Sequence, residues 1–324
     1  MSNMNFPFVV SPYYTGITLS VPPGKMIADL VLPRVPVGGR EFKYQVINSS
    51  DFYILPDTRV GRKGIPNQVE FGATEEGSFV FDDGLLDLVP QADIDAANSN
   101  MHKWDPVAQA TINTTRLLDK SREKRVADLV FNTSSYTAAN RVTLSGSDQW
   151  SDATSDPIDA ILAKFDGMLI RPNKGIFGRL GWSKFRLHPK VTSRLGSALY
   201  GNTSTTNAAA PPASLQAVAD LLELDEILVG EDWVNTAKKG QTPVMTRVWG
   251  KHAAFIHQEP VVSTTEGIAT FGYTAEYGNR RTYTTPMAPG TLGVDGGQSV
   301  VVGESLREVL TAQDCGFLFS NIIA

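Results

Sequence analysis

The chain has very little cysteine and histidine, the residues on which most metal centres and many catalytic sites depend. Cys315 is the single cysteine, so no disulfide can form within the chain and zinc sites that need several cysteines are excluded. His252 and His257 lie close in sequence, but their odd spacing puts them on opposite faces of a strand and on different faces of a helix. We therefore predict no metal site and no cofactor.

Known catalytic motifs are absent as well. The sequence has no GxSxG elbow, HExxH pair, Walker loop or dinucleotide-binding glycine pattern. The carboxylate pairs Asp82–Asp83 and Asp93–Asp95 lack the alternation and the glycine of a calcium-binding loop, and solvated acid is the simpler interpretation. We therefore predict that this chain is not an enzyme.

Long apolar runs are missing too. No stretch approaches the roughly 18 apolar residues that would span a bilayer, and the start of the chain has no basic region followed by an apolar run. These absences predict folding in a reducing cytoplasm without membrane insertion. The net charge of −5 argues against a protein that grips nucleic acid with a basic face, but not against one that encloses it.

The chain does contain enough apolar material for a sizeable core. Hydrophobic residues make up 42% of its 324 positions and charged residues 19%, as in ordinary globular proteins of one large or two smaller domains. Residues 1–56 nevertheless predict an extended arm, because prolines recur along them and disfavour helix. Ordering such an arm costs about 1–2 kcal/mol per residue in backbone entropy, so it must pack either on its own domain or on a partner.

Residues of about 57 to 90 predict a long two-stranded excursion. The basic, turn-rich segment Asp57–Pro66 leads to two β-prone runs, Gln68–Phe71 and Ser78–Phe81, and residues 72–77 could turn the chain between them. A lone two-stranded ribbon is marginal in water. This ribbon therefore needs a surface to lie on, either its own chain's or a neighbour's.

The strongest helix signal covers residues of about 105 to 131, with Asp105 as cap and Pro106 at the first helical position. At 1.5 Å per residue this helix would be roughly 40 Å long. Its basic middle, Lys120–Arg125, is most simply a solvated face. Further helices are predicted at 156–172, at 182–200 with a break near His188–Pro189, and at 214–222, and strands at 227–229, 244–256, 268–277 and 299–302, with 304–311 left open between strand and helix.

The order of several short runs resembles the major capsid proteins of tailed bacteriophages. Ile27–Val37 is similar to the N-arm motif of that family, and Phe42–Tyr44 follows it as it often does there. Similar runs continue at Leu55–Gly61, Val69–Gly72, Asp93–Asp95, Trp150–Asp152, Asp156–Ile158 and Val248–His252. No single motif is chemically diagnostic, but together they cover essentially the whole chain.

The resemblance implies an α+β fold of the Hong Kong 97 type. Mapped onto this chain, it places an N-terminal arm at 1–56, an extended β-hairpin loop at 57–90, a peripheral domain at 91–174 with its spine helix at 105–131, an axial domain at 175–265, and return strands at 266–324. No long charged helical segment precedes the arm, which predicts either a separate scaffolding protein or a leader removed by cleavage. Lys63 lies in the loop, but nothing identifies partners for a covalent cross-link, and we predict none.

The function implied by the resemblance is self-assembly into pentamers and hexamers of an icosahedral shell around double-stranded DNA. The expected partners are the chain itself, scaffolding and portal proteins, possible decoration proteins and non-specifically contacted DNA. The expected location is the virion capsid, after assembly in the host bacterial cytoplasm. An encapsulin-like nanocompartment shell, a phage tail-tube protein and a soluble enzyme remain as alternatives.

The family places the extended loop and the spine helix across a subunit boundary, which suggests a role for their opposite charges. We expect acidic loop residues to face basic spine residues of an adjacent subunit: Glu75, Glu76, Asp82 and Asp83 against Lys120, Arg122, Lys124 and Arg125. Exposed ion pairs contribute only about 0–1 kcal/mol each, so orientation and register are the expected result rather than affinity.

Overall fold

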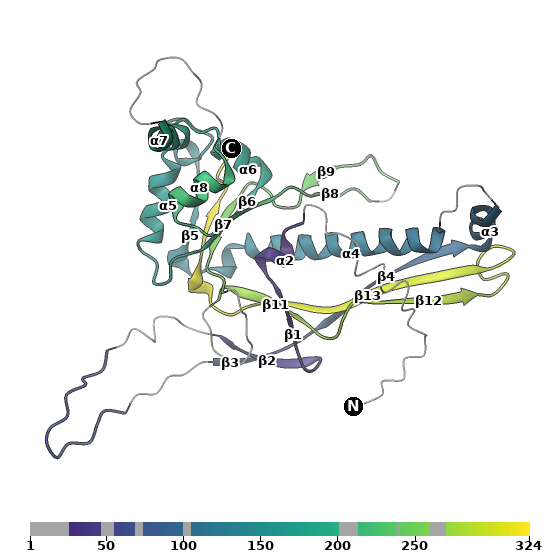
Figure 1. The fold of residues 1–324 in the computed structure, drawn as a ribbon, viewed down its shortest axis with the longest axis horizontal. Coiled ribbons are helices and arrows are strands. Elements are labelled where there is room, and N and C mark those ends of the chain that lie inside the picture. Colours follow the sequence, from purple (N-terminus) through teal and green to yellow (C-terminus); the bar gives the residue numbers. More distant parts are fainter. Residues whose placement is uncertain are drawn as a thin grey trace.

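The computed structural model describes residues 26–46, 55–68, 74–99, 105–200, 213–238, 240–259 and 270–324. Two sheets share one long helix, α4 (Pro106–Val130), which runs along one sheet and ends against the other (Figure 1). The predicted arm before residue 26 and most of the predicted strand Gln68–Phe71 lie outside the described residues. Within the described part, no helix is both long and apolar enough to cross a membrane.

The first sheet has five strands among the described residues, in the order β5, β14, β10, β6, β7. Their bounds are Arg141–Thr143, Gly316–Ser320, Ala253–Ile256, Lys174–Gly178 and Glu226–Gly230. Four helices accompany this sheet: α5 (Pro157–Phe165), α6 (Arg179–Phe185), α7 (Pro189–Tyr200) and α8 (Leu215–Leu222).

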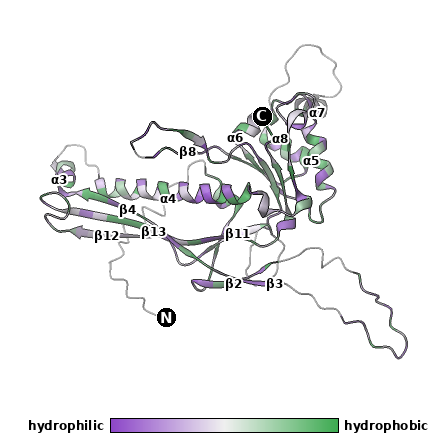
Figure 2. Cartoon of the chain, turned by 180° about the vertical axis from the view of Figure 1, so that it is seen from behind, coloured by the Kyte–Doolittle hydropathy of each residue, from purple (hydrophilic) through white to green (hydrophobic). Residues whose placement is uncertain are grey.

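The central strands of this sheet are buried on both faces, so their side chains belong to two cores. Phe177 and Phe255 point toward α5–α8, whereas their neighbours Ile176 and Ala254 pack with Val126 at the C-terminal end of α4. Figure 2 accordingly shows these strands as predominantly hydrophobic, while the middle of α4 is more hydrophilic. The sequence of a strand that is covered on both faces is typically a continuous run of apolar residues.

The second sheet joins distant parts of the described chain. Its strands are β1 (Arg34–Pro36), β11 (Gly272–Glu276), β13 (Gly297–Leu310) and β12 (Arg281–Met287), with β4 (Phe81–Pro90) also paired to β13. Val300 and Val302 of β13 pack against Val107 and Leu118 of α4. The segment 304–311, which the sequence left open, is therefore mostly strand.

Helix α4 confirms the long helix predicted from the sequence. Asp105 caps it, because its Oδ1 accepts hydrogen bonds from the backbone N–H of Val107 at 2.9 Å and of Ala108 at 3.1 Å. The threonines that interrupt its apolar stripe are still buried. Their hydroxyls are satisfied within the helix, as in the bond from Thr111 Oγ1 to the carbonyl of Val107 at 2.8 Å.

The two-stranded excursion predicted for residues of about 57 to 90 has different strand partners in the structure. The described structure pairs β3 (Thr74–Phe79) with β2 (Glu41–Val46) from the predicted arm, so the predicted turn at 72–77 is wrong where the structure describes it. The other β-prone run is divided, because Phe81 begins β4 and joins β13. The physical reason is tertiary: Phe42 and Tyr44 of β2 pack on the apolar cluster around β11.

The shorter predictions are largely confirmed. The helix expected at 182–200 breaks near His188–Pro189 into α6 and α7, and Ser214 caps α8 through a bond from the Ala217 N–H. The strand expected at 244–256 instead divides into β9 (Met245–Arg247), which pairs with β8 (Trp233–Asn235), and β10. Gly250, with φ of 34°, turns the chain between them. Helices α2 (Ala28–Val31) and α3 (Gln91–Ser99) were not predicted.

Candidate functional site: the charged surfaces and the anchor of the N-terminal segment

The eight charged residues expected to meet across subunits all have a partner within their own chain. The acidic ones lie on β3 and β4, and the basic ones lie on α4. Their partners are Lys43 for Glu75, Tyr44 for Glu76, Arg40 for Asp82, Arg125 for Asp83, Asp232 for Lys120, Asp29 for Arg122 and Asp128 for Lys124. Contact between copies is not tested by one chain, and the intersubunit pairing stays a prediction.

The acidic residues of β3 form cross-strand pairs at the base of the ribbon. Glu75 lies 3.0 Å from Lys43 Nζ, and Tyr44 Oη donates to Glu76 at 2.8 Å. That hydrogen bond and partial burial raise the pKa of Tyr44 to about 12, burial being the larger cause. Such exposed pairs fix the register of two strands more than they stabilise them.

The basic run of α4 is not the uniformly solvated face expected from the sequence. Lys120 and Lys124 remain partly exposed, but Arg122 is only 2% exposed and Glu123 is fully buried. The reason is helical period: residues 122 and 123 share a face with the buried Val126, and α2 covers that face. Arg122 therefore cannot offer a free charge to a neighbour.

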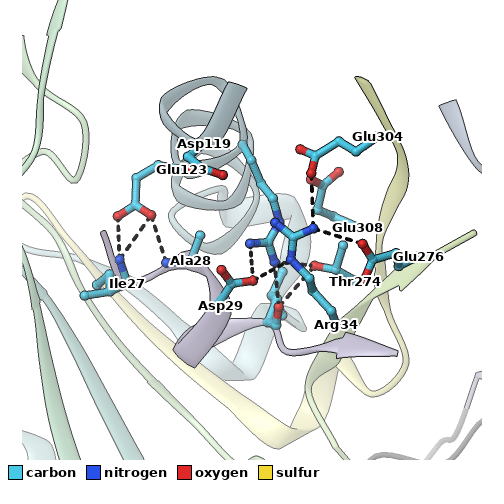
Figure 3. A network of polar contacts seen from close by, with 12 residues as sticks. Ile27, Ala28, Asp29, Arg34, Asp119, Glu123, Thr274, Glu276, Glu304 and Glu308 are labelled. Atoms are coloured by element: carbon cyan, nitrogen blue, oxygen red, sulfur yellow. Dashed lines mark hydrogen bonds and ion pairs between the residues drawn. The ribbon is translucent and has the colours of Figure 1, made fainter. Parts of the chain in front are cut away.

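Arg122 and Glu123 instead hold α2 from its two ends (Figure 3). The Glu123 carboxylate accepts the backbone N–H groups of Ile27, at 3.0 Å, and of Ala28, at 2.8 Å. Arg122 donates to the carbonyl of Leu32 at 3.0 Å and forms an ion pair with Asp29. An anion at the N-terminus and a cation at the C-terminus both complement the helix dipole, which a four-residue helix needs because it is too short to be stable alone.

Trp249 completes this arrangement by binding the same carboxylate. Its indole Nε1–H donates to Glu123, and its ring packs edge-on against Phe131 with centroids 5.5 Å apart. The ring also requires Gly230, since a Cβ there would lie 2.0 Å from Trp249 Cδ1. Burial raises the pKa of Glu123, although these donors favour its ionised form.

A second set of charges fastens β1, which follows α2. Arg34 contacts Glu304 at 3.1 Å and Glu276 at 3.2 Å, while Arg280 donates twice to Glu304, at 2.9 and 2.7 Å. Arg280 also pairs with Asp119 of α4. Burial alone would raise the pKa of Glu304, but the adjacent Arg280 and Arg34 outweigh it and lower that pKa.

We call α2 and β1 together, residues 28–36, the anchored segment. Sequence reasoning missed the residues that fasten it. Glu123 is the one acid within a basic run, and Glu304 lies in the segment 304–311, for which the sequence did not distinguish strand from helix. The available signal was the helical register of α4, which puts residue 123 on the same side as Val126 and Val130.

One buried histidine–serine pair resembles the geometry of a nucleophile and its base. Ser155 Oγ lies 3.2 Å from His188 Nε2. The Lys190 backbone N–H donates to Nδ1 at 3.2 Å, so the ring proton belongs on Nε2, which donates to the carbonyl of Asp152 at 2.9 Å. Because Ser155 Oγ also donates to that carbonyl, His188 is not placed to take the serine proton. The pair ties the loop before α5 to α7.

Metal ligands do not gather in the described part of the chain, where no three His, Cys, Asp or Glu side chains are grouped for an ion. His252 and His257 are engaged separately. The Asn321 N–H donates to His252 Nδ1 at 3.1 Å, and His257 Nε2 lies 3.1 Å from Glu259.

Comparison with known proteins gives relatives that span nearly the whole chain. A major capsid protein of Pseudomonas phage JBD67 is 45% identical over 320 residues, which cover 99% of this chain and 99% of that protein. No family model matches the sequence.

Solved structures share the fold at lower identity. A phage-related protein from Bordetella bronchiseptica RB50 has a TM-score of 0.71 at 20% identity, covering 97% of this chain and 98% of that chain. The capsid structure of cyanophage P-SCSP1u has a TM-score of 0.52 at 11% identity, covering 89% of this chain and 85% of that chain. These two likenesses concern the fold alone.

Proposed function

The chain belongs to the phage major capsid proteins, and from this premise we propose that it folds as a Hong Kong 97-type subunit and assembles into an icosahedral shell of pentamers and hexamers around double-stranded DNA. The observation that carries the proposal is the 45% identity to a major capsid protein over the whole chain. The mixed helix-and-sheet fold and its likeness to a solved phage capsid support the fold type.

The shape of the chain supports assembly as its activity. Residues 55–68, which lie between β2 and β3 in the sequence, are drawn away from the body in Figure 1, and all of them are exposed. A monomer gains little from ordering such an element, whereas a neighbouring copy can bury it. Arm, extended loop, peripheral domain and axial domain are the division that we propose for residues 1–324.

A structural rather than catalytic role follows from the same proposal. The one buried histidine–serine contact described above has the wrong proton arrangement for a nucleophile. Scaffolding and portal proteins, possible decoration proteins and non-specifically contacted DNA would be its partners. Assembly would take place in the host bacterial cytoplasm, and the finished shell would be part of the virion.

Electron microscopy of the purified protein tests the proposal. Closed icosahedral particles are the expected result. Tubes would favour a tail-tube protein, and a small monodisperse particle would overturn the shell altogether. Because an encapsulin-like container would also form closed shells, the contents of particles from infected cells must be examined. DNA supports the proposal, whereas protein cargo without DNA contradicts it.

A further inference from the structure

Charge is divided unevenly along this acidic chain. Residues 167–258 carry 11 lysines and arginines against 6 aspartates and glutamates, whereas the rest of the chain carries 18 against 28. The net charge of −5 therefore combines a stretch of net charge +5 with a remainder of −10. Such an asymmetry indicates a local basic surface that the net charge of the whole chain conceals.

The acids of this stretch leave most of it positive. All six lie between residues 220 and 232, so no acid occurs from 167 to 219 or from 233 to 258. Four of the six already pair with cations of their own chain: Glu223 with Arg171, Glu226 with Lys174, Glu231 with Arg179 and Asp232 with Lys120. The acids therefore do not neutralise the cations that lie outside these pairs.

Four cations of the stretch have no carboxylate partner among the described contacts and gather on three neighbouring elements. Lys184 lies on α6, Lys190 at the start of α7, Lys238 in the turn of the β8–β9 hairpin and Arg247 on β9. We call these four residues the basic face. The three lysines are exposed and Arg247 is half-buried. Figures 1 and 2 draw α7, α6 and the hairpin in a row, with the second sheet on the opposite side of α4.

The hairpin is fastened at its base to two of the helices. Arg179 of α6 lies 2.7 Å from Glu231, which directly precedes β8. Lys120 of α4 lies 3.3 Å from Asp232, the next residue along the chain. These two ion pairs hold the hairpin beside α6 and place its cations in the same row as Lys184.

Side chains within the hairpin fix its turn and one of its cations. Asn235 Oδ1 accepts the backbone N–H groups of Ala237 at 3.0 Å and of Val244 at 2.9 Å. The guanidinium of Arg247 lies over the Trp233 ring, 3.9 Å from its centroid. A guanidinium stacked on an aromatic ring keeps its charge and has less freedom left to lose when it binds a ligand.

We propose that the basic face contacts the phosphate backbone of the enclosed DNA without reading its sequence. The proposal rests on the proposed function, since a shell around DNA brings duplex against part of its subunits. Lysine and arginine bind phosphates by charge, release counterions on doing so and need no base edges. The acidic remainder of the chain limits such contact to this surface, because like charges repel the duplex elsewhere.

A rival group of exposed cations lies at residues 55–68, which we call the basic tip. Arg59, Arg62 and Lys63 accompany the single acid Asp57 there. The basic tip contains no described helix or strand, so holding it against a duplex would cost backbone entropy. The basic face lies on elements that are already ordered, and this difference favours it as the DNA contact.

Binding of a short fluorescein-labelled DNA duplex to the purified full-length chain, followed by fluorescence anisotropy, tests the proposal. We expect K184E/K190E/K238E to lower the affinity at least about tenfold near 50 mM salt. The slope of log affinity against log salt should also become shallower by about 3, since three phosphate contacts are lost. The control K43E/R141E/K164E changes the net charge equally at exposed cations on β2, β5 and α5, and should alter the affinity less than about threefold.

Three results would overturn the proposal. The first is an unchanged affinity of K184E/K190E/K238E. The second is an equal loss of affinity in the control or in the tip variant R59E/R62E/K63E. The third is displacement of the duplex by poly-L-glutamate at an equal concentration of charge, which would show that the surface suits an acidic protein instead.

Shell yield scored by electron microscopy separates this contact from the proposed function. K184E/K190E/K238E should form shells as the wild type does, because the contact is with DNA and not between copies. Loss of shells from this variant, with urea unfolding unchanged, would make the basic face an interface between copies and contradict the proposal. Duplex binding through the basic face without shells would support the contact and contradict the shell; shells without duplex binding would do the reverse.

Discussion

Two segments that precede α4 look alike in sequence and are held in opposite ways. The anchored segment, residues 28–36, has carboxylates and guanidinium groups buried around it, and Glu304 at its centre has a side chain that is 1% exposed. The basic tip, residues 55–68, lies wholly in solvent. Both are short and contain two prolines each. The difference teaches that similar short segments can be fastened to the body of the chain by buried charges or left exposed without them.

Removing the Glu123 carboxylate should break the anchored segment most severely. Glu123→Ala leaves the N–H groups of Ile27 and Ala28 and the indole N–H of Trp249 buried without an acceptor. We expect the free energy of unfolding of the unassembled subunit to fall by about 3–5 kcal/mol. Urea unfolding followed by tryptophan fluorescence measures it. Lys124→Ala, on the next residue of α4, is the control and should change stability by about 0.5 kcal/mol or less. A comparable loss in both variants would contradict the role of Glu123.

Arg280→Met should have the next largest effect, because it removes one of the two cations that neutralise a buried carboxylate. Glu304 would keep Arg34 alone, and we expect a loss of about 2–4 kcal/mol. Met retains much of the stem volume, so lost charge rather than lost packing is tested. Arg141→Met, at an exposed arginine, is the control and should be nearly neutral. A loss below about 1 kcal/mol for Arg280→Met would show that Arg34 suffices.

The pH dependence of the unfolding free energy should distinguish the wild type from Arg280→Met. The pKa of Glu304 is lowered from 4.5, so its ionised form adds stability that is complete above pH 4.5 and is lost as pH falls through the lower folded value. In Arg280→Met that pKa is lowered less. We therefore expect the wild type to lose more stability than the variant between about pH 5 and 3. Equal slopes of the unfolding free energy against pH would contradict this account of Glu304.

Trp249→Phe should weaken the anchored segment moderately. The substitution keeps an aromatic ring against Phe131 but removes the N–H that donates to Glu123. We expect a loss of about 1–2 kcal/mol, since one buried hydrogen bond and part of the ring volume disappear. In the background of Glu123→Ala the same substitution should cost less, because its acceptor is already gone. Additive losses in this double-mutant cycle would argue against the bond.

Changes in the basic tip should have the smallest effect on the subunit itself. Leu55→Ser with Ile65→Ser should shift the unfolding free energy by about 0.5 kcal/mol or less, because both side chains are exposed in the single chain. Shell yield should nevertheless drop, as we propose that an assembled shell buries these side chains between copies. A large loss of subunit stability would show that the tip already packs on its own body.

Predictions from the sequence were most accurate for features that neighbouring residues determine, such as the start or the break of a helix. Asp105 followed by Pro106 marks the start of α4, and Pro189 marks the break between α6 and α7. The ribbon was mispredicted because β propensity does not say which strand will be the partner, and β3 pairs with β2 rather than with the next run. The solvated face expected for Lys120–Arg125 was wrong at Arg122 and Glu123 for a similar reason, since α2 covers that side of α4.

By itself, the sequence determined the start of α4, the lack of a disulfide within the chain, and a resemblance in the order of motifs that the full-length relative confirmed. Only the tertiary structure decided which charges are buried and which project. Arg122 and Glu123 are neighbours of Lys120 and Lys124 in a single basic run, yet the covering helix buries one pair and leaves the other partly in water. The physical reason is that desolvation depends on what packs above a side chain, and the packing partners here come from residues far away along the chain.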